Sequence, residues 1–217
     1  MKPLHALRIL LVVTLLPLFF SIPAPASAQG EIWVIEVNDF RDLPDYGHND
    51  VCDAVYGDSV QQCTLRAAIY EANKHTIGDD EGVLIIIPAG TYTLTLVGAN
   101  ENDAATGDLD IRPEHMNITI EGASAATTII NAAGLDRVFD VHYSTFSVEI
   151  RDLTITGGSL LGPETTSCQY CGAGVFNSGD LTLSNVIIRN NRADQTDSST
   201  GTGHDGGGIF NMSPGNL

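Results

Sequence analysis

From residue 83 onward, short runs of alternating hydrophobic and polar residues follow one another, separated by Gly, Asn and Asp. Because successive side chains of a β-strand point to opposite faces, such runs predict strands with one buried face. The predicted strands are Val83–Ile87, Thr91–Leu96, Asn117–Glu121, Thr127–Asn131, Arg137–His142, Ser147–Thr156 and Asp180–Arg189. No apolar stripe of helix length interrupts the runs, which excludes an alternating βαβ fold.

Sequence blocks in this part of the chain recur at a spacing of 33 to 34 residues. Residues 172–177 (GAGVFN) return as residues 206–211 (GGGIFN), and an apolar block around Asp152 returns around Asn185. The inward alternation changes phase at Asp152 and at Asn185, which predicts a corner there, because Asp and Asn tolerate left-handed backbone. Hairpin signals such as Asn-Gly are absent, so we predict an all-β, right-handed, single-stranded parallel β-helix over residues 83–217.

Residues 29–82 form an acidic segment that ends in one amphipathic helix, predicted over residues 64–73. The apolar side chains that share one helix face are Leu65, Ala68, Ile69 and Ala72. Thr64 is a suitable N-cap. A helix of about ten residues is marginal alone, so its stripe must cover other structure. We expect a short N-terminal helical cap on the open first coil of the solenoid.

The N-terminus carries the three parts of a secretory signal. Basic residues precede an apolar run, Ile9–Ile22, and the small residues Ala26-Ser27-Ala28 follow it. The run is shorter than the roughly 20 residues that span a bilayer. We therefore expect a signal peptide over residues 1–28, cleaved after Ala28, and a mature protein that is secreted or held at the cell surface, without a membrane span.

All four cysteines follow the predicted signal and would meet an oxidising compartment, in which disulfides persist. Four cysteines allow three connectivities. We predict that each cysteine pairs with its nearest partner, Cys52 with Cys63 and Cys168 with Cys171.

The balance of charge limits the partners of the chain. The 217 residues contain 10 Lys and Arg against 27 Asp and Glu, a net charge of −17. Such a chain repels the phosphates of nucleic acids and anionic lipids, so we expect no nucleic-acid partner. The apolar share of 43% excludes a disordered chain.

A resemblance to a known family becomes specific at Cys63. Residues 63–73 (CTLRAAIYEAN) resemble the CSLREA region of secreted bacterial β-helix proteins, and residues 87–94 (IPAGTYTL) resemble the strand that follows it. The glycine-rich repeats are similar to those of polymorphic outer-membrane-protein-like and pectate-lyase-like β-helices. Ala67 stands where the family usually has Glu, so the reciprocal contact of a capping box is lost and we expect a weaker helix start.

The resemblance and the lack of a recognised catalytic motif imply an exported module for adhesion, glycan contact or structural support, without catalysis of its own. Its partner would be a cell-surface or extracellular polysaccharide or protein. The chain stops at residues 215–217, where the repeat predicts another strand, so we expect a longer protein.

The alternative is a carbohydrate-active β-helix enzyme, a polysaccharide lyase or hydrolase. A lyase needs a base and carboxylates that hold Ca²⁺ against a uronate. The outward-facing candidates for catalysis are Asp140, His142, Glu149 and Arg151. A second charged cluster comprises Asp108, Asp110, Arg112, Glu114 and His115.

Calcium is the one cofactor that the sequence suggests. Asp45, Asp50 and Asp53 lie in the acidic loop around Cys52, and Ca²⁺ prefers hard oxygen ligands. The loop lacks the regular spacing of a known calcium motif, and an ordinary solvated loop is the alternative interpretation.

Overall fold

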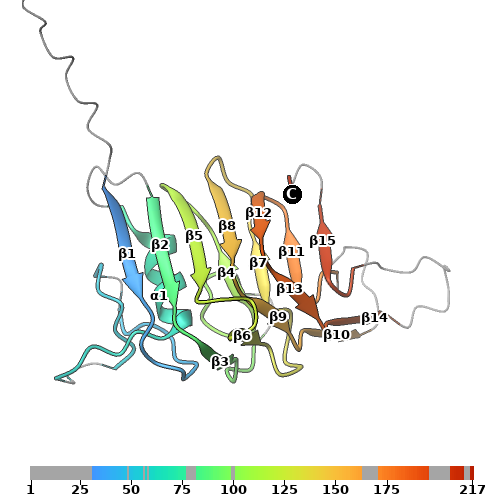
Figure 1. Cartoon of the computed structure of the whole chain (residues 1–217), viewed down its shortest axis with the longest axis horizontal. Coiled ribbons are helices and arrows are strands. Elements are labelled where there is room, and N and C mark those ends of the chain that lie inside the picture. The colour runs from blue at the N-terminus through green and yellow to red at the C-terminus, as the bar shows by residue number, and fades with distance from the viewer. Residues whose placement is uncertain are drawn as a thin grey trace, which may run out of the picture.

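The computed structural model describes residues 31–47, 49–55, 57, 59–76, 82–98, 101–162, 171–195, 206–212 and 216–217. Within these residues, every pair of neighbouring strands is parallel, and the strands wind as a β-solenoid of about three turns (Figure 1). The predicted all-β, parallel β-helix architecture is confirmed. The predicted signal peptide, residues 1–28, and Cys168 lie outside the described residues.

From β2 onward, each turn of the solenoid contributes one strand to each of three sheets, and β1 adds a further strand to the first (Figure 1). The first sheet contains β1 (Ile32–Glu36), β2 (Gly82–Ile87), β5 (Asn117–Gly122), β8 (Ser147–Arg151) and β12 (Asp180–Ser184). The second contains β3 (Gly90–Thr93), β6 (Thr128–Asn131), β9 (Thr154–Thr156) and β13 (Ile187–Arg189). The third contains β4 (Leu109–Ile111), β7 (Phe139–Val141), β11 (Val175–Asn177) and β15 (Ile209–Asn211). A separate two-stranded sheet pairs β10 (Ser159–Gly162) with β14 (Arg192–Gln195).

The strand register stacks equivalent side chains into columns that run through the core. One column contains Ile35, Ile85, Ile120 and Ile150, each directly paired with the next and none more than 4% exposed. Burying one such side chain contributes about 1.5–3 kcal/mol. The core is therefore a stack of repeated apolar contacts between neighbouring turns.

Both predicted corners adopt the backbone that the sequence indicated. Asp152 has a φ of 57° and Asn185 a φ of 53°, and each separates a strand of the first sheet from one of the second. The two side chains stack, because the Asn185 amide donates a hydrogen bond to the Asp152 carboxylate of the preceding turn. The corner is thus reinforced between turns as well as within the chain.

Helix α1 (Leu65–Lys74) begins within one residue of its predicted start. The Thr64 hydroxyl accepts a hydrogen bond from the N–H of Ala67 at 3.1 Å, which confirms the N-cap. The Asn73 side chain then pairs with the edge of β4: its amide donates to the carbonyl of Asp110 at 2.8 Å and its oxygen accepts from the N–H of Arg112 at 2.7 Å. One side chain thereby satisfies backbone groups that a further strand would otherwise bind.

Strand β1 was not predicted, although it lies within the acidic segment of residues 29–82. It pairs along its length with β2, so the first sheet begins before the helix. The loop between β1 and α1 is closed by a Cys52–Cys63 disulfide with a Cα–Cα distance of 5.0 Å, which confirms that pairing. Cys171 is also disulfide-bonded, but the predicted partner Cys168 is outside the described residues.

Candidate functional site

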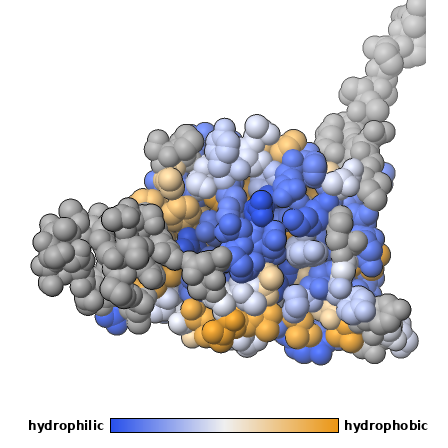
Figure 2. All heavy atoms as spheres, turned by 180° about the vertical axis from the view of Figure 1, so that it is seen from behind, coloured by the Kyte–Doolittle hydropathy of each residue, from blue (hydrophilic) through white to orange (hydrophobic). Residues whose placement is uncertain are grey.

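A cluster of charged side chains lies on the third sheet and the segments beside it. We call it the wall cluster, and its members are Asp108, Asp110, Asp136, Arg137, Asp140 and His142. The face of the molecule turned away in Figure 1 has a hydrophilic area in its middle (Figure 2). Four of its members, Asp108, Asp110, Asp136 and Arg137, are buried, and the other two are partly buried.

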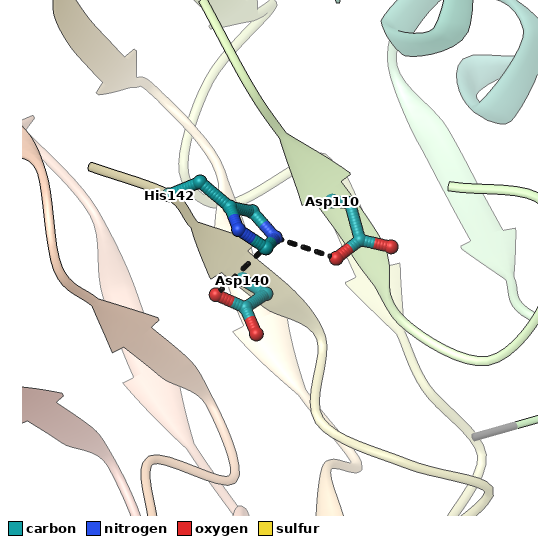
Figure 3. A group of neighbouring side chains, drawn as sticks. All are labelled: Asp110, Asp140 and His142. Atoms are coloured by element: carbon teal, nitrogen blue, oxygen red, sulfur yellow. Dashed lines mark hydrogen bonds and ion pairs between the residues drawn. The ribbon is translucent and has the colours of Figure 1, made fainter. Parts of the chain in front are cut away.

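Strand register explains why three of these side chains meet. Asp110 of β4 is directly paired with Asp140 of β7, and both point outward from the apolar interior. His142 follows Asp140 by two residues and therefore lies on the same face. Its Nε2 is 2.9 Å from Oδ1 of Asp110 and 3.8 Å from Oδ1 of Asp140 (Figure 3).

The second oxygen of each carboxylate is held by a different group. Oδ2 of Asp110 accepts a hydrogen bond from the N–H of Ala104 at 3.0 Å, and Asp110 is only 1% exposed. Oδ2 of Asp140 accepts from Nη1 of Arg137 at 3.0 Å. These contacts fix the carboxylates so that their Oδ1 atoms face His142.

Arg137 links the cluster to a neighbouring carboxylate and to an aromatic side chain. Its Nε lies 3.0 Å from Oδ2 of Asp108, while its guanidinium carbon lies 5.1 Å from the centre of the Phe176 ring. The ring of Phe176 in turn stacks on that of Phe210 in the next turn, with centroids 5.6 Å apart. The guanidinium is therefore fixed on several sides.

Crowding of carboxylates shifts the proton equilibria of the wall cluster. Burial, followed by the charge of Asp136, raises the pKa of Asp108 to about 9, although Arg137 acts in the opposite direction. Burial also raises the pKa values of Asp136 and Asp140. The cluster thus contains four carboxyl groups, one guanidinium and one imidazole, and the carboxyls of Asp108, Asp136 and Asp140 hold their protons at higher pH than free aspartate does.

The predicted catalytic residues separate into two places. Asp140 and His142 meet in the wall cluster, whereas Glu149 and Arg151 lie on β8 of the first sheet. There Arg151 donates to Glu149 at 3.0 Å and to Glu121 of the preceding turn at 2.8 Å. The four residues do not form one site.

The second predicted cluster also divides. Asp108 and Asp110 belong to the wall cluster, while Arg112, Glu114 and His115 lie further out. Arg112 pairs with Asp103 at 3.0 Å and with Glu114 at 3.8 Å, and His115 lies 3.9 Å from Glu114. These outer pairs are half-exposed and form a solvated surface network.

Sequence reasoning missed the contact between Asp110 and Asp140, as well as the roles of Asp136 and Arg137. A signal was present: Leu109-Asp110-Ile111 and Phe139-Asp140-Val141 share one pattern of an aspartate between two apolar residues. That pattern predicts two short strands with an outward aspartate on each.

The three predicted calcium ligands, Asp45, Asp50 and Asp53, all have partners within the protein. Asp45 accepts hydrogen bonds from the N–H groups of Gly47 and Asp53, both at 2.9 Å. Asp53 accepts two further backbone N–H groups at 3.2 Å. Oδ1 of Asp50 lies 2.9 Å from Nδ1 of His75. The carboxylates of Asp45 and Asp53 therefore order the loop itself, whereas that of Asp50 joins the loop to the end of α1.

A groove of about 450 Å³ opens on another part of the surface, beside β1. We call it the aromatic groove; it is lined by Glu36, Val37, Asn38, Phe40, Ile86, Pro88 and Tyr92. Phe40 is 54% exposed and packs on buried Tyr92, with ring centroids 5.1 Å apart. Gly90 permits this position, because a Cβ there would clash with the Phe40 ring.

The fold defines the class of protein as a parallel β-solenoid. Comparison of the chain with protein-family models, with curated proteins and with solved structures found no match. Within the described residues, no helix is both long and apolar enough to cross a membrane.

Proposed function

We propose that the protein is an exported β-helix module of the CSLREA type that contacts an extracellular or cell-surface glycan and has no catalysis of its own. The aromatic groove is the observation that carries this proposal. It combines the exposed ring of Phe40 with the carboxylate of Glu36 on a rigid sheet edge. An apolar surface with a few polar groups is typical of small-ligand sites, and a sugar presents C–H groups and hydroxyls to match it.

The negative charge of the chain favours binding of neutral rather than acidic glycans. A net charge of −17 repels uronates, and Glu36 adds a negative charge to the groove itself. The predicted signal peptide and the CSLREA-like segment support an extracellular location, where such a ligand is found.

The test is binding of the secreted protein to immobilised neutral, uronate-rich and amino-sugar polysaccharides. We expect retention on a neutral polysaccharide, reduced at least tenfold by Phe40→Ala. Tyr143→Ala removes a 69% exposed aromatic ring outside the groove and is the matched control. Equal binding by the two variants, or no retention on any polysaccharide, would contradict the proposal.

A carbohydrate-active enzyme is the second candidate, because the wall cluster has parts suited to proton transfer. Buried Asp110 orients His142, and the carboxyl of Asp140 lies beside the same imidazole nitrogen. This candidate predicts release of new reducing ends from a polysaccharide, abolished by His142→Ala but unaffected by Phe40→Ala. Absence of product across the same polysaccharides would reject it.

A further inference from the structure

We propose that Asp110, Asp140 and His142 bind a divalent transition-metal ion, with Zn²⁺ as the best fit. Three ligand atoms from three side chains converge: Oδ1 of each aspartate and Nε2 of the histidine, all within 4.8 Å of one another. Zinc binds nitrogen and carboxylate oxygen at about 2.0–2.2 Å, which places the ligands of one ion roughly 3–4 Å apart. The observed separations of 2.9 and 3.8 Å from Nε2 fit this arrangement with small side-chain shifts (Figure 3).

The supporting contacts around these ligands are those of a prepared metal site. Metal-binding carboxylates are typically oriented by hydrogen bonds to the atoms that do not touch the ion. Here Oδ2 of Asp110 is held by the N–H of Ala104, and Oδ2 of Asp140 by Arg137. In both residues the remaining Oδ1 faces Nε2 of His142, so an ion between them would leave the supporting contacts intact.

The two aspartates also have a rigid backbone. Asp110 and Asp140 lie on paired strands of one sheet, and the edge of β4 is fixed by the Asn73 side chain. Ligands on strands keep their separation better than ligands on a loop. In the acidic loop, by contrast, the carboxylate oxygens of Asp45 accept hydrogen bonds from the N–H groups of Gly47 and Asp53.

Charge favours a cation at this position. Four carboxyl groups of the wall cluster share one guanidinium, that of Arg137. A bound divalent cation would be the largest local charge there and would offset the negative charge of the carboxylates that hold it. A nitrogen ligand and only three protein ligands favour zinc over calcium, which prefers six to eight oxygens. The side chain of His142 is 24% exposed, so solvent or a ligand atom can complete the coordination.

The test is titration of the metal-free protein with Zn²⁺, Mn²⁺ and Ca²⁺, measured by calorimetry and by the thermal unfolding midpoint. We expect one Zn²⁺ per chain and a rise in the midpoint, because an ion that binds the folded state stabilises it. Calcium should give neither effect. His142→Ala and Asp140→Asn should each weaken Zn²⁺ binding at least tenfold.

Glu149→Gln is the matched control, since it neutralises a half-exposed carboxylate on a different sheet. Far-ultraviolet circular dichroism of each metal-free variant verifies the fold, and Asp140→Asn preserves the shape of the side chain. Perturbation of the His142 ring signals by Zn²⁺ in nuclear magnetic resonance locates the ion independently of affinity. Unchanged Zn²⁺ binding in both site variants, or no Zn²⁺ binding by the parent protein, would overturn the proposal.

Discussion

The acidic loop before α1 and the wall cluster use aspartate in opposite ways. In the loop, the carboxylates of Asp45 and Asp53 accept hydrogen bonds from backbone N–H groups. In the wall cluster, Asp110 and Asp140 lie on paired strands. Oδ2 of Asp110 accepts one backbone N–H, that of Ala104, but Oδ1 of each aspartate faces the His142 side chain. A loop consumes its carboxylates to fix its own shape. A high density of acidic residues therefore does not locate a binding site. The site is located by carboxylate oxygens that face other side chains instead of the backbone.

The two regions also differ in how buried charge is balanced. Beneath the loop, Arg66 is fully buried, pairs with Asp42 at 2.6 Å and donates to three backbone carbonyls at 2.8–3.0 Å. The Arg66 guanidinium is thus balanced by one carboxylate, and each of its N–H donors has an acceptor. In the wall cluster, Arg137 is shared between carboxylates and negative charge is in excess. The first arrangement stabilises the cap, whereas the second is suited to an added cation.

The largest effect should come from breaking the balanced pair. Arg66→Met leaves Asp42 buried without its guanidinium, and loss of one partner of a buried ion pair costs about 3–5 kcal/mol. We expect a loss of this size in the free energy of unfolding, measured with urea. Arg112→Met, at a half-exposed surface pair, should cost less than about 1 kcal/mol. Similar losses in the two variants would show that the cap is not held by its buried charge.

In the wall cluster, where carboxyl groups outnumber the guanidinium, removing a charge should raise the free energy of unfolding rather than lower it. The pKa of Asp108 is raised from 3.8 to about 9, so the folded state favours the protonated carboxyl. Its stabilising contribution is complete below about pH 4 and is lost as the pH rises toward 9. Asp108→Asn mimics the protonated form and should be more stable than the parent at pH 8, by on the order of 1–3 kcal/mol.

Urea unfolding between pH 4 and pH 9 checks this prediction. The parent should lose stability across the interval, and Asp108→Asn should flatten the curve. Asp103→Asn, at a carboxylate whose side chain is 54% exposed, is the control and should leave the slope unchanged. A slope that persists unchanged in Asp108→Asn would show that Asp108 is not the source of the pH dependence.

The sequence predicted those parts of the fold that repeat locally. Strands of the first sheet have alternating side chains over five or six residues. The three-residue strands β9 and β13 continue two of these runs past the corners at Asp152 and Asn185, which carry residues suited to positive φ. Strands β4, β11 and β15 also have three residues each but continue no such run, so their alternation does not stand out. Strand β1 was hidden because an acidic, cysteine-bearing loop follows it and suggested a separate cap.

The sequence predicted part of the wall cluster. The pairing of Asp110 with Asp140 was missed because that turn of the solenoid is shorter than the recognised repeats. Asp140 and His142 are two positions apart, so their shared face follows from the strand period. Asp110 precedes Asp140 by 30 residues, whereas the recognised repeats are 33 to 34 residues apart, so the pairing did not emerge from the sequence. Glu149 was grouped with Asp140 through proximity in sequence, but the turn after His142 leads the chain into another sheet.

The smallest effect should come from the third charged group, on the outer face of the first sheet. Arg151 joins Glu121 and Glu149 there, and all three side chains are between 32% and 36% exposed. Exposed pairs contribute about 0–1 kcal/mol and are screened by salt. Arg151→Gln should therefore cost less than about 1 kcal/mol in urea unfolding at low salt, and the loss should shrink in high salt. Glu121→Gln in the same background isolates the coupling between the two side chains. A loss of more than about 2 kcal/mol that persists in high salt would mean that this ladder resembles the buried pair at Arg66 rather than a solvated surface.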